Sequence, residues 1–355
     1  MASPQARGPR QADVAREAGV SQSTVSMVLG GATEAQRISG ETRRRVIEAA
    51  RKLRYTAQTA KPSSRASTQG LLLGVHTFEP VFPTNTGDYY FEFLRGIEEQ
   101  AVAESCNLVL FTATQTEDGI RRIYDADGVN ALRHAAGSVL LGHHAGPDEL
   151  ARLENDGYPF VFIGRREVPG MDIAYVGGDY RGATARIVGD LVAQGHRRFA
   201  YLGEARRRET QTDRWEGFAG ALTRFGLAVP EPAFTTPEQL TAQWLDAALA
   251  DGATAVLVES VNLVRVLAVM TGVRGLGIPD DLSVVLLVDS PGGPTESHPW
   301  ACLHVPRNGM GRRAVRLLVQ LLGDPAGDHE RQVLLPCTHN LTGTVAPPRH
   351  TGSAP

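Results

Sequence analysis

Apolar residues near the start of the chain recur with the spacing of a short amphipathic helix. Val14, Ala15 and Ala18 fall on one helical face, and Gly19 stands where a helix would end in a left-handed cap. Ser21 is placed to cap a second helix, because its hydroxyl can accept a hydrogen bond from a free backbone N–H of the first turn. The pattern predicts a helix, a tight turn and another helix.

The second helix and a third one each divide into an apolar and a polar face. On the second helix, the apolar face is formed by Val25, Val28 and Leu29. The opposite face is formed by Gln22, Ser23, Ser26 and Met27. Ser39 is placed to cap a third helix over residues 41–52, which turns inward Val46, Ala49, Ala50 and Leu53 and outward Arg43, Arg44, Arg45 and Arg51. Three short helices around a small core are predicted.

From residue 70 onward, short apolar strands alternate with amphipathic helical segments. Strands are expected at residues 71–78, 108–111, 138–141, 160–163, 199–202, 255–259 and 283–288, and helices at 93–105 and 183–194. Such alternation predicts a parallel α/β sheet. About 280 residues exceed what one sheet holds comfortably, so two α/β lobes with a cleft are expected.

Composition places the chain among soluble folded proteins. It has 355 residues, 42% hydrophobic and 21% charged, and its apolar runs are far shorter than a membrane-spanning helix. The first residues are charged, so no export signal is recognised and a cytoplasmic protein without membrane contact is expected. Cys106, Cys302 and Cys337 stand apart from each other and from histidines at metal spacing, so we expect buried thiols and no disulfide framework or metal site.

The net charge of −3 conceals a basic start and an acidic remainder. Residues 1–66 hold twelve Lys and Arg against five Asp and Glu, whereas residues 67–355 hold 24 against 34. Lys and Arg displace counterions from phosphates, so this division indicates a head that meets a polyanion, with a solvated basic tail as the alternative. Exposed Gln and Ser beside arginines favour DNA, because amide and hydroxyl groups read base edges in the major groove.

Motifs of the common enzyme classes are missing from the chain. It has no P-loop, no HExxH zinc motif and no GxSxG nucleophile elbow, and GLGIPD at residues 275–280 lacks the spacing of a dinucleotide-binding turn. We therefore expect neither an enzyme nor a cofactor. The alternative to a DNA-binding regulator is a stand-alone receptor for small solutes, which would share the α/β body but have an export signal in place of the basic head.

Residues 13–55 resemble the DNA-binding headpiece of the lactose-repressor (LacI) family of bacterial transcription regulators. The resemblance is carried by DVAREAGVSQSTVSMVLGG at residues 13–31 and ISGETRRRVIEAARKLRY at residues 38–55. It implies base contacts by Gln22, Ser23 and Met27, and backbone contacts or packing by Thr24, Ser26 and Tyr55. Arg43 is expected to hold DNA phosphates.

Two stretches depart from the pattern of this family. Met27 stands where the family usually has arginine, so contact with a thymine methyl is the most that its side chain can offer. In the linker, Pro62 lies inside the segment that forms a short hinge helix in the family, and Ser64 replaces the leucine that wedges into the minor groove. A weaker or differently coupled hinge is predicted.

The rest of the chain resembles the effector-binding core of the same family. The likeness is carried by FLRGIEEQA at 93–101, YVGGDYRGATARIVGDLVAQGHRRFAYLGE at 175–204, TDRWEGFAGAL at 212–222, GIPDDLSVVLLVD at 277–289 and VPRNGMGRRAVRLLVQLL at 305–322. It implies an all-α helix-turn-helix headpiece at residues 1–55, a hinge at 56–68, an α/β periplasmic-binding-protein-like core of two lobes at 69–345 and a tail at 346–355. One lobe is expected at about 69–175 and 306–332, the other at about 176–305 and 333–345.

The resemblance also implies which residues line the cleft. Tyr89 and Tyr90 match positions that stack on a bound ring, Thr77 and Phe78 lie beside them at the end of the first strand, and further candidates are Arg165, His143 and His144. Arg214 matches an arginine that reaches the ligand, which favours a polar ligand. Where the family usually has Asn-Asp, the chain has Ser260 and Val261, and either Glu259 or Asn262 could supply the missing hydrogen-bond acceptor.

The function implied is that of a ligand-gated repressor. Two headpieces of a homodimer would occupy successive major grooves of a near-palindromic, double-stranded operator, and a sugar or nucleoside-like effector in the cleft would change their spacing. No leucine heptad follows the core, so a four-chain assembly is not expected. Such a repressor would act in the cytoplasm, associated with the nucleoid.

Overall fold

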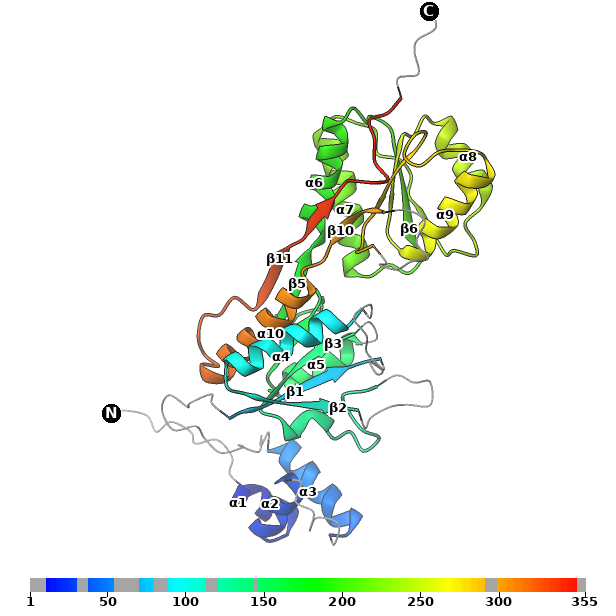
Figure 1. The fold of residues 1–355 in the computed structure, drawn as a ribbon. Helices are drawn as coiled ribbons and strands as arrows, with labels where there is room; N and C mark the ends of the chain where they lie inside the picture. The colour runs from blue at the N-terminus through cyan, green and yellow to red at the C-terminus, as the bar shows by residue number, and fades with distance from the viewer. Residues whose placement is uncertain are drawn as a thin grey trace, which may run out of the picture. The chain divides into compact units, whose positions relative to one another are not determined.

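The computed structural model of the chain describes residues 11–30, 38–53, 70–79, 89–112, 121–142, 146–290 and 299–349, with the backbone alone described at Met27, Gly30 and Arg51. It divides into two compact units, residues 1–66 and 67–355, each described by itself (Figure 1). Tyr55, Pro62, Ser64, His143 and His144 lie outside the described residues, as does the predicted hinge. None of the described helices is long and apolar enough to cross a membrane.

The described part of the first unit is a bundle of three helices. They are α1 (Gln11–Ala18), α2 (Gln22–Gly30) and α3 (Gly40–Lys52). Val14, Val25 and Val46, one from each helix, are fully buried together. This confirms the apolar faces that the spacing of the sequence predicts.

The ends of these helices follow the predicted capping residues. Gly19 has a φ of +64°, the left-handed conformation that ends α1 at little cost for glycine. The backbone N–H of Thr24 donates to Oγ of Ser21 at 3.1 Å, and that of Thr42 donates to Oγ of Ser39 at 3.2 Å. Both serines therefore cap their helices.

The second unit consists of two α/β lobes. The first lobe contains β1 (Leu72–Thr77), α4 (Phe91–Ala103), β2 (Asn107–Phe111), the 3₁₀ turn η2 (Ala131–His134), β3 (Gly137–Leu141), α5 (Pro147–Asn155), β4 (Phe160–Ile163), β5 (Tyr175–Asp179), α10 (Arg307–Gly323) and β11 (Gln332–Pro336). Its sheet has the order β11-β5-β4-β3-β1-β2 and every strand pair is parallel. Helices α4 and α10 cover one face and α5 covers the other (Figure 1).

The second lobe repeats this arrangement. It contains α6 (Tyr180–Ala193), β6 (Phe199–Glu204), α7 (Glu209–Arg224), β7 (Ala233–Thr235), α8 (Ala242–Ala250), β8 (Ala255–Val258), α9 (Val261–Val273), β9 (Ser283–Leu286), β10 (Ala301–His304) and β12 (Thr338–Asn340). Its sheet has the order β12-β10-β9-β8-β6-β7, and β12 pairs antiparallel to β10. Helices α6 and α7 pack on one face and α8 and α9 on the other.

The central strands are apolar throughout because both faces of each sheet are covered. All residues of β3, β4, β8 and β9 are buried. Strands of parallel sheets with helices on both faces show this continuous hydrophobicity. The runs that predict strands in the sequence are therefore the centres of the two sheets.

The lobe boundaries differ by a few residues from those expected. Strands β5 and β11 pair in parallel from Tyr175 opposite Gln332 to Asp179 opposite Pro336, so both belong entirely to the sheet of the first lobe. The chain changes lobe after residue 179, between 304 and 307, and at 337, instead of at 175/176 and 332/333. The pairing between two strands that are far apart in sequence sets these boundaries, and local hydrophobicity carries no sign of it.

The three cysteines are buried, as the sequence predicts. Burial raises the pKa of the Cys337 thiol to about 12. Cys337 lies between β11 and β12, where the chain passes from one lobe to the other. Its thiol therefore stays protonated and packs as a small apolar group.

Close packing of α6 against α7 generates a first prediction. A Cβ added at Gly217 would lie 2.3 Å from the backbone oxygen of Arg181, whereas one added at Gly220 on the same helix would meet nothing within 4 Å. Gly217→Ala should lower the free energy of unfolding by about 1–3 kcal/mol through overpacking. Gly220→Ala should raise it by up to about 1 kcal/mol, because alanine favours the helix. Urea unfolding followed by circular dichroism measures the free energy of unfolding of both variants. A Gly217→Ala variant as stable as the wild type would contradict the close packing.

Candidate functional site

A pocket of about 740 Å³ lies between the two lobes of the second unit. Its walls come from residues that follow the strands and begin the helices: Tyr89 and Tyr90 before α4, Arg208 and Thr210 at the start of α7, Ser260 and Val261 at the start of α9, and Arg307 at the start of α10. Parallel α/β sheets bind ligands at this end of their strands. The volume suits a small organic molecule.

The first lobe contributes an aromatic wall. Tyr89 and Tyr90 both line the pocket, with ring centroids 5.3 Å apart in an edge-to-face arrangement. The hydroxyl of Tyr90 donates to Oε2 of Glu79 at 2.6 Å, which holds that ring in place. Tyr89 is 44% exposed, and the guanidinium carbon of Arg307 lies 5.4 Å from the centroid of its ring. The sequence predicts these two residues for the cleft, and the structure brings them to it.

The second lobe contributes Arg214 from α7. Only 5% of Arg214 is exposed, and its guanidinium carbon lies 4.3 Å from the centroid of the Tyr180 ring. Nη1 donates to the backbone oxygen of Thr210 at 3.5 Å, and the buried Nε has no hydrogen-bond partner. Arg214 lines the pocket, as the sequence predicts.

Glu259 occupies the region of the missing acceptor, but its oxygens are engaged. Oε1 accepts from the hydroxyl of Tyr201 at 2.6 Å, and Oε2 accepts from the backbone N–H of Glu204 at 2.8 Å and from Nη1 of Arg207 at 2.5 Å. Burial, together with the negative charge of Glu259, raises the pKa of Tyr201, so this hydroxyl remains a donor. Glu259 lines the pocket, whereas Asn262, the other candidate, is exposed on α9 and does not.

Thr77 and Phe78 lie elsewhere than predicted. Both are fully buried and neither lines the pocket. Oγ1 of Thr77 accepts from Nη1 of Arg121 at 2.7 Å, and Phe78 packs against Phe162 in the apolar core beneath the sheet. The first strand therefore ends in the core, and the tyrosines that precede α4 take the place at the pocket.

His76, next to them on β1, is also fully buried, and neither of its ring nitrogens has a hydrogen-bond partner. Burial, aided by the positive charge of Arg121, lowers its pKa to about 4. The imidazole is therefore neutral at physiological pH. It packs edge-on against Phe78, with ring centroids 4.8 Å apart, as part of the core.

The sequence also predicts Arg165 for the cleft, but the structure places the neighbouring Arg166 there. Arg166 lines the pocket, donates to the backbone oxygen of Gly142 at 3.0 Å and pairs with Glu209 of α7 at 3.2 Å. Arg165 points the other way: Nε and Nη2 donate to the two carboxylate oxygens of Asp213, each at 2.9 Å. Successive residues after a strand point to opposite sides, which explains the exchange. The pattern of the sequence could indicate the pair but not the direction of each.

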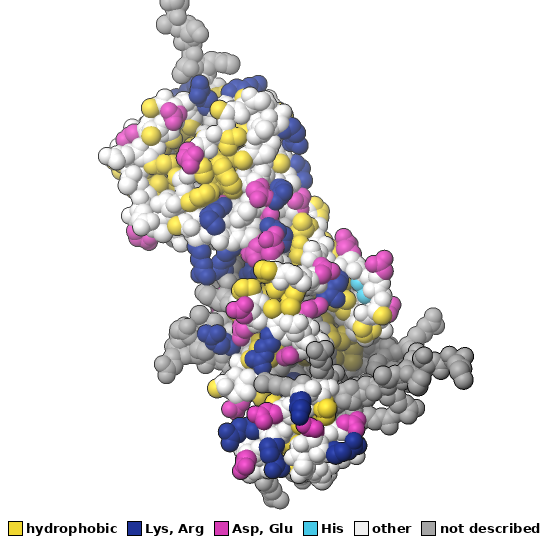
Figure 2. Space-filling view, turned by 180° about the vertical axis from the view of Figure 1, so that it is seen from behind, with side chains coloured by type: hydrophobic (Ala, Val, Ile, Leu, Met, Phe, Trp, Pro, Cys, Tyr) yellow, Lys and Arg dark blue, Asp and Glu magenta, His cyan; other side chains and the backbone are white. Residues whose placement is uncertain are grey.

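Arginine–carboxylate pairs connect the lobes around the pocket. Arg165 with Asp213 and Arg166 with Glu209 join the end of β4 to α7, and Arg307 of α10 lies 3.2 Å from Asp289, which follows β9. Figure 2 shows acidic and basic side chains interspersed at the waist between the lobes. Oδ2 of Asp289 also accepts from the backbone N–H of Val305, and Oδ1 lies 3.3 Å from Nδ1 of His304. These pairs fix the distance between the lobes in this arrangement.

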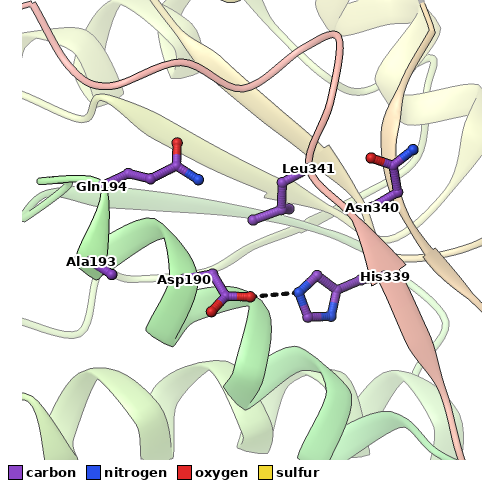
Figure 3. Close-up of a pocket in the computed structure, with 6 residues that line it drawn as sticks. All are labelled: Asp190, Ala193, Gln194, His339, Asn340 and Leu341. Carbon is purple, nitrogen blue, oxygen red and sulfur yellow. Dashed lines mark hydrogen bonds and ion pairs between the residues drawn. The ribbon is translucent and has the colours of Figure 1, made fainter.

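A second hollow lies on the second lobe alone (Figure 3). It is lined by Asp190 and Ala193 of α6, by Gln194 directly after that helix, and by His339, Asn340 and Leu341. Nε2 of His339 lies 2.6 Å from Oδ2 of Asp190. It shares no lining residue with the interlobe pocket. Without the arginines and tyrosines of that pocket, it is the weaker candidate for a ligand.

The predicted DNA-reading residues lie on the outside of the helical unit. Gln22, Ser23 and Ser26 are exposed on α2, opposite the buried Val25. The hydroxyls of Ser23 and Thr24 are 2.7 and 2.8 Å from that of Ser21, so they complete the capped start of the helix. Arg43 lies in the first turn of α3 and is half-buried. The structure thus supplies an exposed helix start rich in amide and hydroxyl groups.

The Arg165–Asp213 contact generates a second prediction. Their side chains are 17% and 8% exposed, so we expect a double-mutant cycle of Arg165→Met and Asp213→Asn to give a coupling free energy of about 1–3 kcal/mol. Arg181 is the matched control: it lies 3.8 Å from the same carboxylate but is 59% exposed, so its coupling with Asp213 should stay below about 1 kcal/mol. Urea unfolding of the variants measures both. Equal coupling free energies for the Arg165–Asp213 and Arg181–Asp213 pairs would contradict a specific contact between the lobes through Arg165 and Asp213.

Comparisons with known proteins point to one family. Residues 12–58 match the model of bacterial regulatory proteins of the lacI family, and residues 188–343 match that of the periplasmic binding protein-like domain. The chain is 31% identical to an uncharacterized HTH-type transcriptional regulator in the aml 5' region of Streptomyces limosus, over 88% of each protein. It is 28% identical to catabolite control protein A of Staphylococcus aureus, an alignment that spans 61% of each chain.

The fold has solved counterparts. The structure of a complex of the transcriptional regulator CelR with cellobiose superposes with a TM-score of 0.61 at 22% identity, covering 95% of this chain and all of that one. At this identity the likeness shows the fold alone. It agrees with a helical headpiece followed by a two-lobed α/β core.

Proposed function

The chain belongs to the LacI family of bacterial regulatory proteins, and from this premise we propose that it is a transcriptional repressor whose hold on operator DNA is set by a small molecule in the interlobe pocket. The observation that carries the proposal is the joining, in one chain, of a helix-turn-helix unit with exposed Gln22 and Ser23 and a two-lobed core with a polar pocket. A solute receptor has no use for the first of these units. The repressor would act in the cytoplasm, where the nucleoid is.

Operator recognition would divide between α2 and the arginines of α3. Gln22, Ser23 and Ser26 lie on the exposed side of α2, where amide and hydroxyl groups can meet base edges in the major groove. Thr24 sits at the capped start of the helix, suited to a phosphate. Arg43 is proposed as a phosphate contact, while Met27 and Tyr55 keep the base-edge and backbone roles implied by the family.

The proposed assembly is a homodimer, because one headpiece binds DNA weakly and a second, tethered one acts at high effective concentration. Support comes from α9, which carries Val269 and Val273 on its outer face, 67% and 81% exposed. Two valines one helical turn apart form an apolar strip that nothing else in the described chain covers. A second copy of the chain would bury it.

The effector would work by changing how the lobes meet. The proposed ligand is a ring compound, a sugar or nucleoside, held by Tyr89 and Tyr90 on one side and Arg214 on the other. The pocket is lined from both lobes, so a bound ligand favours one relative position of the lobes over others. In a dimer this shift changes the spacing of the two headpieces and therefore the affinity for operator.

Base reading and phosphate holding can be separated by substitution. After selection of an operator from random duplexes, Gln22→Ala should narrow the affinity differences among operator variants, at a cost of about 1–3 kcal/mol on the best one. Arg43→Ala should weaken all duplexes by a similar factor and reduce the slope of log affinity against log salt by about one. Fluorescence anisotropy over a salt series measures both. If Gln22→Ala leaves the ranking of operators unchanged, α2 does not face the bases as proposed.

The dimer surface has its own test. Val273→Asp would bury a carboxylate in the interface, so the dimer dissociation constant should rise at least about tenfold, equivalent to about 1.4 kcal/mol. Val229→Asp, in a loop of the same lobe, is the matched control and should leave dimerisation unchanged. Sedimentation velocity over a range of concentrations measures the constant. A dimer unaffected by Val273→Asp would place the interface elsewhere.

A further inference from the structure

We infer that the effector of the interlobe pocket carries an anionic group, a carboxylate or a phosphate, and that Arg214 pairs with this group. The inference rests on the proposed function, in that it names the class of ligand for the same pocket. Its basis is a buried positive charge that the described part of the protein leaves without an acidic partner.

Arg214 is only 5% exposed, and its Nε has no hydrogen-bond partner. None of the ion pairs among the described residues includes it. Its contacts are one long hydrogen bond to the backbone oxygen of Thr210 and the face of the Tyr180 ring. A guanidinium taken out of water is costly unless a hydrogen-bonding anion meets it, and a tyrosine ring compensates for only part of that cost.

Most of the neighbouring carboxylates pair with other cations. Asp213, next in sequence, takes both donors of Arg165. Glu259 is held by Arg207 and two further donors, and Asp289 by Arg307. Glu92, which also lines the pocket, lies 2.9 Å from Arg95. Glu204 accepts from the side-chain amide of Gln211 and forms no ion pair with Arg214. No carboxylate of the described residues thus pairs with Arg214, and an acidic group of the ligand would be its ionic partner.

Further arginines line the pocket together with Arg214. Arg166 and Arg208 line the same pocket, and burial together with repulsion from Arg206 and Arg166 lowers the pKa of Arg208. Helix α7 begins at the pocket with no side chain capping its first N–H groups. The positive end of its dipole adds to the field of the arginines. A carboxylate or phosphate would relieve the repulsion.

The remainder of the pocket suits the ring that carries the acid. Tyr89 lines the pocket from the lobe opposite Arg214 and is 44% exposed. A sugar acid, sugar phosphate or nucleotide has both parts, a ring for the tyrosine and an acid for the guanidinium. A neutral sugar or nucleoside could accept hydrogen bonds from Arg214 but would bring no negative charge to pair with it.

Inorganic phosphate serves as the first probe. Purified full-length protein should melt several degrees higher in phosphate than in chloride at equal ionic strength, because an anion that binds the folded state alone stabilises it. Arg214→Met should abolish this difference, while Arg224→Met, on the exposed far end of the same helix, should retain it. The inference is overturned if the wild type shows no phosphate-specific shift, or if Arg214→Met shows the same shift.

Matched pairs of organic ligands then distinguish the two acids. Calorimetric titration with glucose, glucuronate and glucose 6-phosphate, and with uridine and its 5'-monophosphate, should give a dissociation constant at least tenfold lower for a charged member than for its neutral partner. A preference for glucuronate identifies a carboxylate, and a preference for the phosphates identifies a phosphate. Neutral members that bind as tightly as the charged ones would overturn the inference. Should Arg214→Met fail to fold, this comparison on the wild type decides by itself.

Operator binding separates the two levels of the proposal. If the protein selects an operator but shows no charge preference in its pocket, the anionic effector is wrong and the repressor stands. If it binds no duplex selectively, the proposed function fails, whatever the pocket binds.

Discussion

Both sheets of the core turn the carboxyl ends of their parallel strands toward one gap, and the rest of the site depends on this constraint. Each strand that ends there is followed by a loop or a helix whose first residues face the gap. Arg166 after β4, Glu259 and Ser260 after β8 and Asp289 after β9 come to the same pocket for this reason. A polar pocket between two apolar cores follows from the topology alone.

Helix α7 joins the pocket to the contact between the lobes. Asp213 and Arg214 are adjacent on it, about 100° apart around the helix axis, so one points to Arg165 of the first lobe and the other into the pocket. Glu209, one turn earlier, pairs with Arg166. A ligand that draws on Arg214 therefore acts on the same rigid element that holds the lobes together. This gives the proposed coupling between effector and lobe position a physical carrier.

The features that the sequence predicts correctly depend on residues close together in the chain. The hydroxyls of Ser21 and Ser39 accept hydrogen bonds from backbone N–H groups three residues later and so cap their helices. Gly19 permits its own turn, and the apolar runs of β3, β4, β8 and β9 mark the strands. The family resemblance added Tyr89, Tyr90 and Arg214 as pocket residues, and the structure brings all three to the pocket. Their roles toward DNA and ligand stay predictions.

The misses have a common cause, which is that direction and pairing are set by distant parts of the chain. Thr77 points inward because its hydroxyl accepts a hydrogen bond from Arg121, 44 residues away. Arg165 points away from the pocket because its guanidinium donates to Asp213, 48 residues away, and Arg166 lines the pocket in its place. By itself, the sequence determined the helical headpiece, the two-lobed class of the core and the residue types of the pocket, since helix capping and hydrophobic period are local properties. Only the tertiary structure decided which side chains face the pocket, where the chain changes lobe and which buried charge lacks a partner, because each depends on contacts between residues far apart in sequence.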